Sequence, residues 1–129
     1  MMNSELIPKD KFDISSFEKL MALSDDEIDA LIPPLLEWIQ DMNWTVSSYM
    51  VRVLSKHRRA VEKYLPDLLK PQQTDNEWKR NIIRYLLSEW SAADERITAE
   101  IKRIAEHPTD GERLEAVDEA ANEYLKHHS

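Results

Sequence analysis

The chain has no cysteine and a single glycine, Gly111, among its 129 residues. The absence of cysteine excludes disulfides, thiolate catalysis and cysteine-ligated zinc. The scarcity of glycine disfavours an all-β fold with many tight turns, and it excludes a glycine-rich phosphate loop. The sequence also contains no GxSxG, HExxH or Walker-type motif. None of the common catalytic motifs therefore indicates an enzyme.

Long apolar runs are missing as well. No stretch approaches the roughly 18 residues that a helix needs to cross a bilayer, and the N-terminus lacks the apolar segment of a secretion signal. We therefore expect a cytoplasmic protein without a membrane partner. Hydrophobic residues make up 42% of the chain and charged residues 33%, which is typical of a folded globular protein. The length predicts one domain over residues 1–129.

Charge is unevenly distributed along the chain, whose formal net charge is −8. Residues 1–45 carry 3 basic and 10 acidic side chains, a net charge of −7. Residues 46–85 carry 9 and 4, a net charge of +5, and residues 86–129 carry 5 and 11, a net charge of −6. Nucleic-acid binders generally present a cationic field, so the overall charge disfavours a nucleic-acid partner but leaves room for a local basic surface.

Two stretches of the sequence, residues 32–57 and 65–90, align without gaps at a spacing of 33 residues. Repeats of this length are typical of stacked helix pairs. The sequence therefore predicts an all-α fold, a short HEAT-like stack of antiparallel helix pairs with six or seven helices. The positions identical in both copies include Pro33/Pro66, Leu35/Leu68, Leu36/Leu69, Asn43/Asn76, Leu54/Leu87 and Ser55/Ser88.

Local signals predict where the helices begin and end. Residues 1–12 are expected to form an irregular arm, and Asp13 to cap a first helix that ends near Leu23. Ser24, followed three residues later by a glutamate, predicts a capping box. Helix breaks are expected at the prolines within the repeat copies and just after them, which are Pro33, Pro34, Pro66 and Pro71.

Residues 92–127 are expected to form helices that cap the C-terminal end of the stack. Thr109, with a glutamate three residues on, predicts a second capping box. The helix that it opens is expected to run without a break to about Lys126, with Leu114 facing inward.

Three segments of the chain resemble one known family: IPKDKFD at residues 7–13, LLEWIQDMNW at 35–44 and NEWKRNII at 76–83. On these segments the chain resembles a bacterial family described as domain of unknown function 5071. The proline followed by Leu-Leu in each copy also resembles HEAT-type repeats, in which the second helix of each pair lines the inner face. The resemblance implies a HEAT-like all-α fold, and it implies no activity because the family has none assigned.

Basic side chains at helical spacing form the first candidate site. Arg52, Lys56 and Arg59 share one helix face, and Arg80 and Arg84 share another. The two sets make a single patch only if these faces meet in the fold; otherwise they are solvated faces that pair with the acidic ends of the chain. We select four of them as candidates to bind an acidic surface of another protein, namely Arg52, Lys56, Arg80 and Arg84.

Tryptophans form the second candidate site. Trp44 and Trp78 each lie at the start of the second helix in their copy of the repeat. One interpretation is structural, with both indoles wedged between successive repeats. The other is functional, because an exposed aromatic ring contributes strongly to binding a partner or ligand. We include both residues among the partner-binding candidates.

No metal site, cofactor or catalytic residue is predicted. The acidic residues at 25–29 suit the first turn of a helix, where carboxylates interact favourably with the helix dipole. The four histidines suggest no helical pair with a carboxylate at zinc spacing. We expect His57 to be partly buried or to cap a helix rather than to bind a metal, because it ends an apolar stripe. Carboxylate catalysis has no fixed spacing, so a pair such as Glu37 and Asp41 stays open.

These observations favour a non-catalytic protein-binding module that uses the inner surface of helices at 44–58 and 76–90. By analogy with small acidic helical proteins of bacteria, we expect an adaptor or an immunity- or antitoxin-like inhibitor. The alternative is a nucleic-acid-acting enzyme of the HEAT-like glycosylase type that uses the central basic segment. A third possibility is a small-molecule binder in which the tryptophans form a stacking platform. The sequence indicates no oligomeric state.

Overall fold

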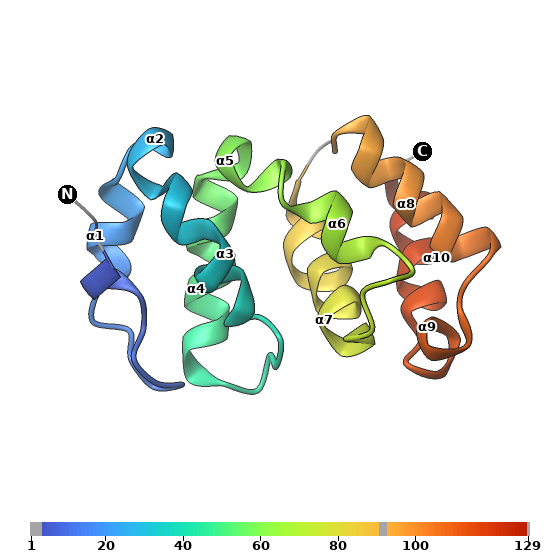
Figure 1. Ribbon diagram of the computed structural model, residues 1–129, viewed down its shortest axis with the longest axis horizontal. Helices are drawn as coiled ribbons and strands as arrows, with labels where there is room; N and C mark the ends of the chain where they lie inside the picture. The colour runs from blue at the N-terminus through green and yellow to red at the C-terminus, as the bar shows by residue number, and fades with distance from the viewer. Residues whose placement is uncertain (1–3, 91–92, 129) are drawn as a thin grey trace. The chain divides into compact units, whose positions relative to one another are not determined.

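The computed structural model describes residues 4–90 and 93–128, which form helices joined by turns and contain no strand (Figure 1). The all-α prediction is confirmed. The chain divides into two compact units, unit 1 (Met1–Lys63) and unit 2 (Tyr64–Ser129). Each unit contains one copy of the sequence repeat. None of the helices in the described ranges combines the length and the apolar character needed to cross a membrane.

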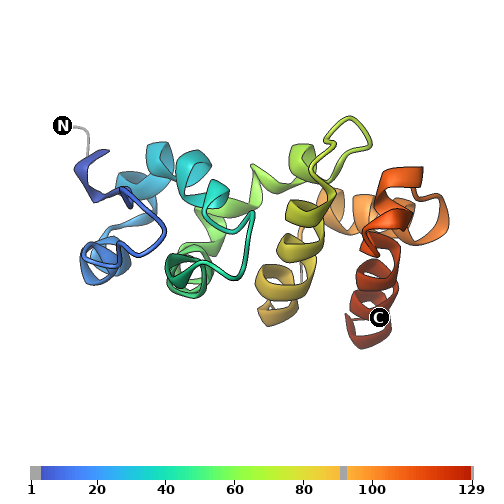
Figure 2. The ribbon, with the colours of Figure 1, turned by 90° about the horizontal axis from the view of Figure 1, so that it is seen from below.

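Unit 1 is built around the 12-residue helix α4 (Thr45–Lys56). Helices α1 (Phe17–Ala22) and α3 (Ile32–Glu37) pack against α4, as Figures 1 and 2 show. Helix α2 (Asp25–Ile28) packs against α5 (Arg58–Glu62), and the short 3-10 turns η1 (Ser4–Leu6) and η2 (Asp29–Leu31) complete the unit. The apolar side chains of the unit that have no exposed surface are Leu20, Ile28, Ile32, Leu35, Ile39, Val46, Val53, Leu54 and Val61.

Helix α1 begins later than predicted, at Phe17 rather than directly after Asp13. The Asp13 carboxylate accepts hydrogen bonds from the backbone N–H groups of Lys9 and Ser15 and from the Ser15 hydroxyl. These bonds close a local turn, which competes with helix capping. Ile14 follows Asp13 and is 39% exposed instead of joining an apolar helix face.

The prolines mark helix starts, as predicted. Pro33 lies in the first turn of α3, and Pro66 lies in the first turn of α6 (Leu65–Leu69). A residue in the first turn donates no hydrogen bond within its helix, so proline fits there and its fixed φ favours helix initiation. The described residues consequently contain more and shorter helices than the six or seven expected.

Unit 2 pairs two 12-residue helices, α8 (Glu95–Glu106) and α10 (Val117–His128), which lie side by side (Figure 1). Helix α6 packs on α8, and α7 (Asn76–Asn81) packs on α10. Helix α7 continues into a π-helical turn, η3 (Ile82–Leu86), and a 3-10 turn, η4 (Leu87–Glu89). The apolar side chains without exposed surface are Leu65, Leu69, Ile82, Leu86, Leu87, Ile97, Ile101, Ile104, Val117 and Ala121.

The C-terminal helix differs from the prediction. The capping box of Thr109 and Glu112 is present and opens α9 (Asp110–Leu114), but the helix does not continue into α10. Ala116 interrupts it with a φ of 60°, the left-handed conformation that L-residues rarely adopt. Leu114 is consequently 84% exposed rather than turned inward.

Candidate functional site

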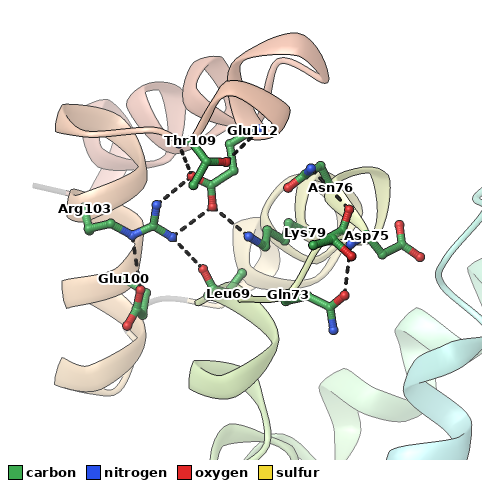
Figure 3. A network of polar contacts seen from close by, with 10 residues as sticks. Leu69, Gln73, Asp75, Asn76, Lys79, Glu100, Arg103, Thr109 and Glu112 are labelled. Atoms are coloured by element: carbon green, nitrogen blue, oxygen red, sulfur yellow. Dashed lines mark hydrogen bonds and ion pairs between the residues drawn. The ribbon is translucent and has the colours of Figure 1, made fainter. Parts of the chain in front are cut away.

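A cluster of buried charges joins four helices of unit 2 (Figure 3). Lys79 on α7 and Glu112 on α9 have no exposed side-chain surface, and Lys79 Nζ lies 2.7 Å from Glu112 Oε2. Arg103 on α8 donates to the two Glu112 oxygens at 2.6 and 2.9 Å and to the Leu69 carbonyl at the end of α6 at 2.8 Å. Glu112 Oε1 also accepts the backbone N–H of Thr109 at 2.8 Å. We call Lys79, Arg103 and Glu112 the ionic cluster.

The ionic cluster stabilises the charged form of its carboxylate. Burial alone would raise the pKa of Glu112, but hydrogen bonds from Arg103, Lys79 and the Thr109 N–H lower the pKa to about 2. The bond to Glu112 in turn raises the pKa of the Arg103 guanidinium. Because Lys79 and Glu112 have no surface open to solvent, neither can meet a ligand. We assign the cluster to holding α6, α7, α8 and α9 together.

Unit 1 carries a surface groove of about 290 Å³ that two tryptophans line. Trp38 directly follows α3, Trp44 directly precedes α4, and both indoles are partly exposed. Their ring centroids lie 5.6 Å apart with the planes at 72°, an edge-to-face arrangement that aromatic pairs favour. Pro34, from α3, and Pro8, from the N-terminal arm, also line the groove; Pro34 is half-buried and Pro8 is buried. We call this site the aromatic groove.

A network of hydrogen bonds holds the loop that carries the two tryptophans. Ser47, on the first turn of α4, is fully buried, and its hydroxyl lies 2.5 Å from the Trp38 carbonyl oxygen and 2.7 Å from that of Asp41. The N–H of Trp44 donates to the Asp41 carbonyl at 3.3 Å. The N–H of Val46 donates to the carbonyl of Lys11 at 2.9 Å, which ties the arm to the same turn. The groove is therefore formed before any ligand arrives.

The polar groups of the aromatic groove are few. Its lining includes the exposed carboxylate of Glu37 and the amide of Gln40, and it includes no basic side chain. Within the described residues, neither the Trp38 nor the Trp44 indole N–H has a hydrogen-bond acceptor. The lining thus combines an apolar surface with one negative charge and with two indoles whose N–H groups have no acceptor in the described residues.

Unit 2 carries a second groove, of about 510 Å³, between η3 and α10. Arg84, Tyr85, Glu123 and His127 are exposed along it. We call it the histidine groove, because His127 and His128 both line it. The opposite charges of Arg84 and Glu123 give it a mixed electrostatic character, in contrast to the aromatic groove.

Two polar side chains of the histidine groove, those of Ser88 and His128, contact backbone carbonyl oxygens. The Ser88 hydroxyl donates to the Arg84 carbonyl at 2.5 Å. The His128 ring stacks on Tyr124 with centroids 4.0 Å apart. Its Nδ1 lies 2.9 Å from the Tyr124 carbonyl and its Nε2 lies 3.1 Å from the Trp90 carbonyl. Ser88 therefore stabilises the turn from η3 to η4, and His128 holds the end of α10.

Over residues 6–125 the sequence matches the family described as Domain of unknown function (DUF5071). The chain belongs to this family. No curated protein matches it.

In this DUF5071 protein the predicted basic candidates are divided between the two units. Arg52 and Lys56 lie on α4 of unit 1, and both are exposed. The Arg52 guanidinium lies over the Phe17 ring at 5.0 Å from its centroid, a cation–π contact inside the unit. Arg52 therefore helps to join α1 to α4.

The other two basic candidates lie on unit 2, Arg80 on α7 and Arg84 on η3. Arg80 donates to the carbonyl of Glu115 at 2.9 Å and lies 3.6 Å from its carboxylate, so much of its donor capacity is used within the unit. Arg84 is exposed in the histidine groove. Of the four candidates, Lys56 and Arg84 are those that the structure leaves most available.

The two predicted tryptophans have different surroundings. Trp78 is the third residue of α7, is 9% exposed, and donates its backbone N–H to the capping carboxylate of Asp75. Trp44 is the residue that caps α4, so its side chain lies outside the helix and is partly exposed. Sequence reasoning did not select Trp38, although the segment LLEW places it directly after an apolar helix face.

Within the described residues of this DUF5071 chain, no histidine belongs to a group of three or more side chains that could bind a metal ion. His57 is 2% exposed between α4 and α5, with Nδ1 3.0 Å from an Asp25 carboxylate oxygen and Nε2 2.8 Å from the Leu20 carbonyl. His57 is therefore buried more deeply than the partial burial that the sequence predicted. Glu123 and His127 lie four residues apart on α10, a helical pair that was not predicted from the sequence. Two ligands without a third do not make a zinc site.

Proposed function

We propose that the chain is a non-catalytic protein-binding module whose docking surface is the aromatic groove. The observation that carries this proposal is the pair of adjacent indoles, Trp38 and Trp44, held partly exposed by a hydrogen-bonded loop. Tryptophan is enriched among the residues that dominate the energetics of protein interfaces. A rigid aromatic site also loses little conformational entropy when a partner binds.

The contacts in the histidine groove support the non-catalytic part of the proposal. Nucleophilic catalysis requires a nucleophile hydrogen-bonded to its base. Ser88 and His128 both line this groove and carry side chains of the types that such a pair needs. The Ser88 hydroxyl donates to a backbone carbonyl, and both nitrogens of His128 face backbone carbonyls instead. Neither side chain is oriented toward a substrate.

The proposal retains the role expected from the sequence, an adaptor or an immunity- or antitoxin-like inhibitor in the bacterial cytoplasm built on HEAT-like helix pairs. Lys56 and Arg84 are exposed and are candidates for an additional contact with an acidic patch of the partner. The alternative function, a nucleic-acid-acting enzyme, is disfavoured by the net charge of −8. It is retained as one outcome of the test.

Affinity capture from the organism that encodes the chain tests the proposal. Wild type and Tyr85→Ala should capture the same protein, and Trp38→Ala/Trp44→Ala should lose it. Tyr85 provides a matched control because it is an aromatic residue of unit 2 that is 46% exposed. Glu37→Lys provides a second groove variant that leaves both indoles in place. Circular dichroism melts establish that each variant is folded before capture.

Each outcome of the capture experiment has a defined meaning. Loss of the partner in both folded groove variants, with retention in Tyr85→Ala, supports docking in the aromatic groove. Retention of the partner in both groove variants would overturn the proposal. Capture that disappears after nuclease treatment would instead favour the nucleic-acid alternative.

A further inference from the structure

We propose that the aromatic groove binds an extended, proline-rich segment that carries a basic residue, in the polyproline II conformation. This inference rests on the proposed protein-binding function and names the chemistry of the partner. Four properties of the groove carry it: the aromatic and proline lining, the free indole donors, the isolated carboxylate and the preformed loop.

The lining matches the side chains of a proline-rich segment. Trp38 and Trp44 present ring surfaces at 72° to each other, beside Pro8 and Pro34. Grooves lined by aromatic residues are the recurring receptors for proline-rich segments, because flat proline rings pack on flat aromatic faces. A polyproline II helix is already extended in the free peptide, so little entropy is lost when it binds.

The free donors distinguish an extended ligand from a helical one. Neither indole N–H has an acceptor within the described residues. The backbone carbonyls of a polyproline II helix make no internal hydrogen bonds, so they are available as acceptors. Most carbonyls of an α-helical ligand are already bonded within the helix and would leave the indoles unpaired. A β-strand would need a sheet edge to pair with, and the described residues contain no strand.

Charge selects a basic residue in the segment. Glu37 is exposed in the groove and is the one ionisable side chain among its lining residues. Residues 1–45 carry a net charge of −7, so the surrounding field also favours a cationic ligand. An arginine or lysine beside the proline run would pair with Glu37, and an acidic residue there would be repelled.

Isothermal titration calorimetry, which measures the affinity of the full chain for short synthetic peptides, tests this inference. The probe is hexaproline ending in arginine, and the matched peptides are hexaproline ending in glutamate and a Gly-Ser repeat ending in arginine. Wild type should bind the first peptide roughly tenfold more tightly than the second, since opposite charges at one contact differ by about that factor. Binding of the Gly-Ser peptide should be too weak to measure, because it lacks both the proline rings and the extended conformation.

Variants assign the binding to individual groups. Trp44→Ala should abolish binding of the arginine peptide. Glu37→Gln should reduce the preference for arginine over glutamate to about twofold or less. Glu77→Gln removes an exposed carboxylate from α7 of unit 2 and should change nothing. Because Glu37→Gln replaces an exposed side chain, it keeps the test informative even if Trp44→Ala fails to fold.

Several results would overturn the inference. These are absence of saturable binding to the arginine peptide, equal binding of the Gly-Ser peptide, or an unchanged charge preference in Glu37→Gln. Displacement of the peptide by tetramethylammonium at the same concentration would identify the groove as a site for small cations instead. If peptide binding fails while Trp38→Ala/Trp44→Ala still loses its partner in affinity capture, the protein-binding function stands and only the class of ligand is wrong.

Discussion

Lys79 Nζ and Glu112 Oε2 lie 2.7 Å apart, and neither side chain has any exposed surface. Arg103 contacts the same carboxylate from α8 and is 23% exposed. The carboxylate is therefore shared by two cations, one of which has no access to water. Removing the shared anion and removing one cation should have unequal consequences for stability.

Glu112→Gln should destabilise the protein by about 3–5 kcal/mol, because it leaves the Lys79 ammonium buried without an anionic partner. Lys79→Met should cost less, at most about 2 kcal/mol, because Glu112 keeps Arg103 and the methionine side chain fills a similar volume. The shift of the urea midpoint in each variant measures the difference. Lys70→Met, which removes an exposed ion pair with Asp67, is the control and should leave the midpoint nearly unchanged. Equal losses in the two cluster variants would contradict the assignment of Glu112 as the shared partner.

Low pH should reduce the free energy of unfolding, because it protonates the carboxylate of Glu112. The pKa of Glu112 is about 2 in the folded chain, below its ordinary value of 4.5. A depressed pKa contributes stability that is present above pH 4.5 and is lost as the pH falls toward 2. The contribution corresponds to about 3 kcal/mol. Urea midpoints of wild type and Glu112→Gln at a series of pH values should therefore converge as the pH falls. A difference that stays constant with pH would exclude this cause.

Ala116 is the position where a glycine should stabilise the fold. Its φ of 60° places an alanine in the left-handed region, which costs an L-residue about 1–2 kcal/mol. Ala116→Gly removes this cost but increases the entropy of the unfolded chain, so we expect a net gain of roughly 0.5–1 kcal/mol. Ala99→Gly, at an exposed position inside α8, should lose about 1 kcal/mol. A loss in both variants would show that Ala116 does not adopt this conformation in solution.

Helix positions could be predicted where the deciding residues are close in sequence. The capping boxes that begin at Ser24 and Thr109 and the helix starts at Pro33 and Pro66 depend on bonds within one turn. The break at Ala116 could not be predicted, because alanine gives no sequence signal for a positive φ and the single glycine lies elsewhere in the chain. Similarly, Asp13 has the side chain of a helix cap but closes its own turn.

The ionic cluster and the aromatic groove could not be predicted in the same way, because each is made by residues that lie far apart in the sequence. Lys79 aligns with Val46 of the first copy, which is fully buried. A lysine at an apolar position of the repeat was therefore an available signal for a buried charge. Its partner Glu112 stands 33 residues further on, and no local pattern connects the two. The aromatic groove likewise needs Pro8 beside Trp38, which only the docking of the N-terminal arm brings about.

Trp44 and Trp78, which lie near the start of the second helix in their copies of the repeat, should respond differently to truncation. Trp78 is 9% exposed within α7, so Trp78→Ala should cost about 3–5 kcal/mol, the usual range for removing a buried aromatic side chain. Trp44 lies outside α4 and keeps part of its surface in solvent, with Trp38 as its ring partner. Trp44→Ala should therefore cost about 1–2 kcal/mol, most of it the lost edge-to-face contact and partial burial. Chemical denaturation of the two variants measures both losses. If Trp44→Ala costs as much as Trp78→Ala, the indole at position 44 serves the core, and the aromatic groove loses its main support as a docking surface.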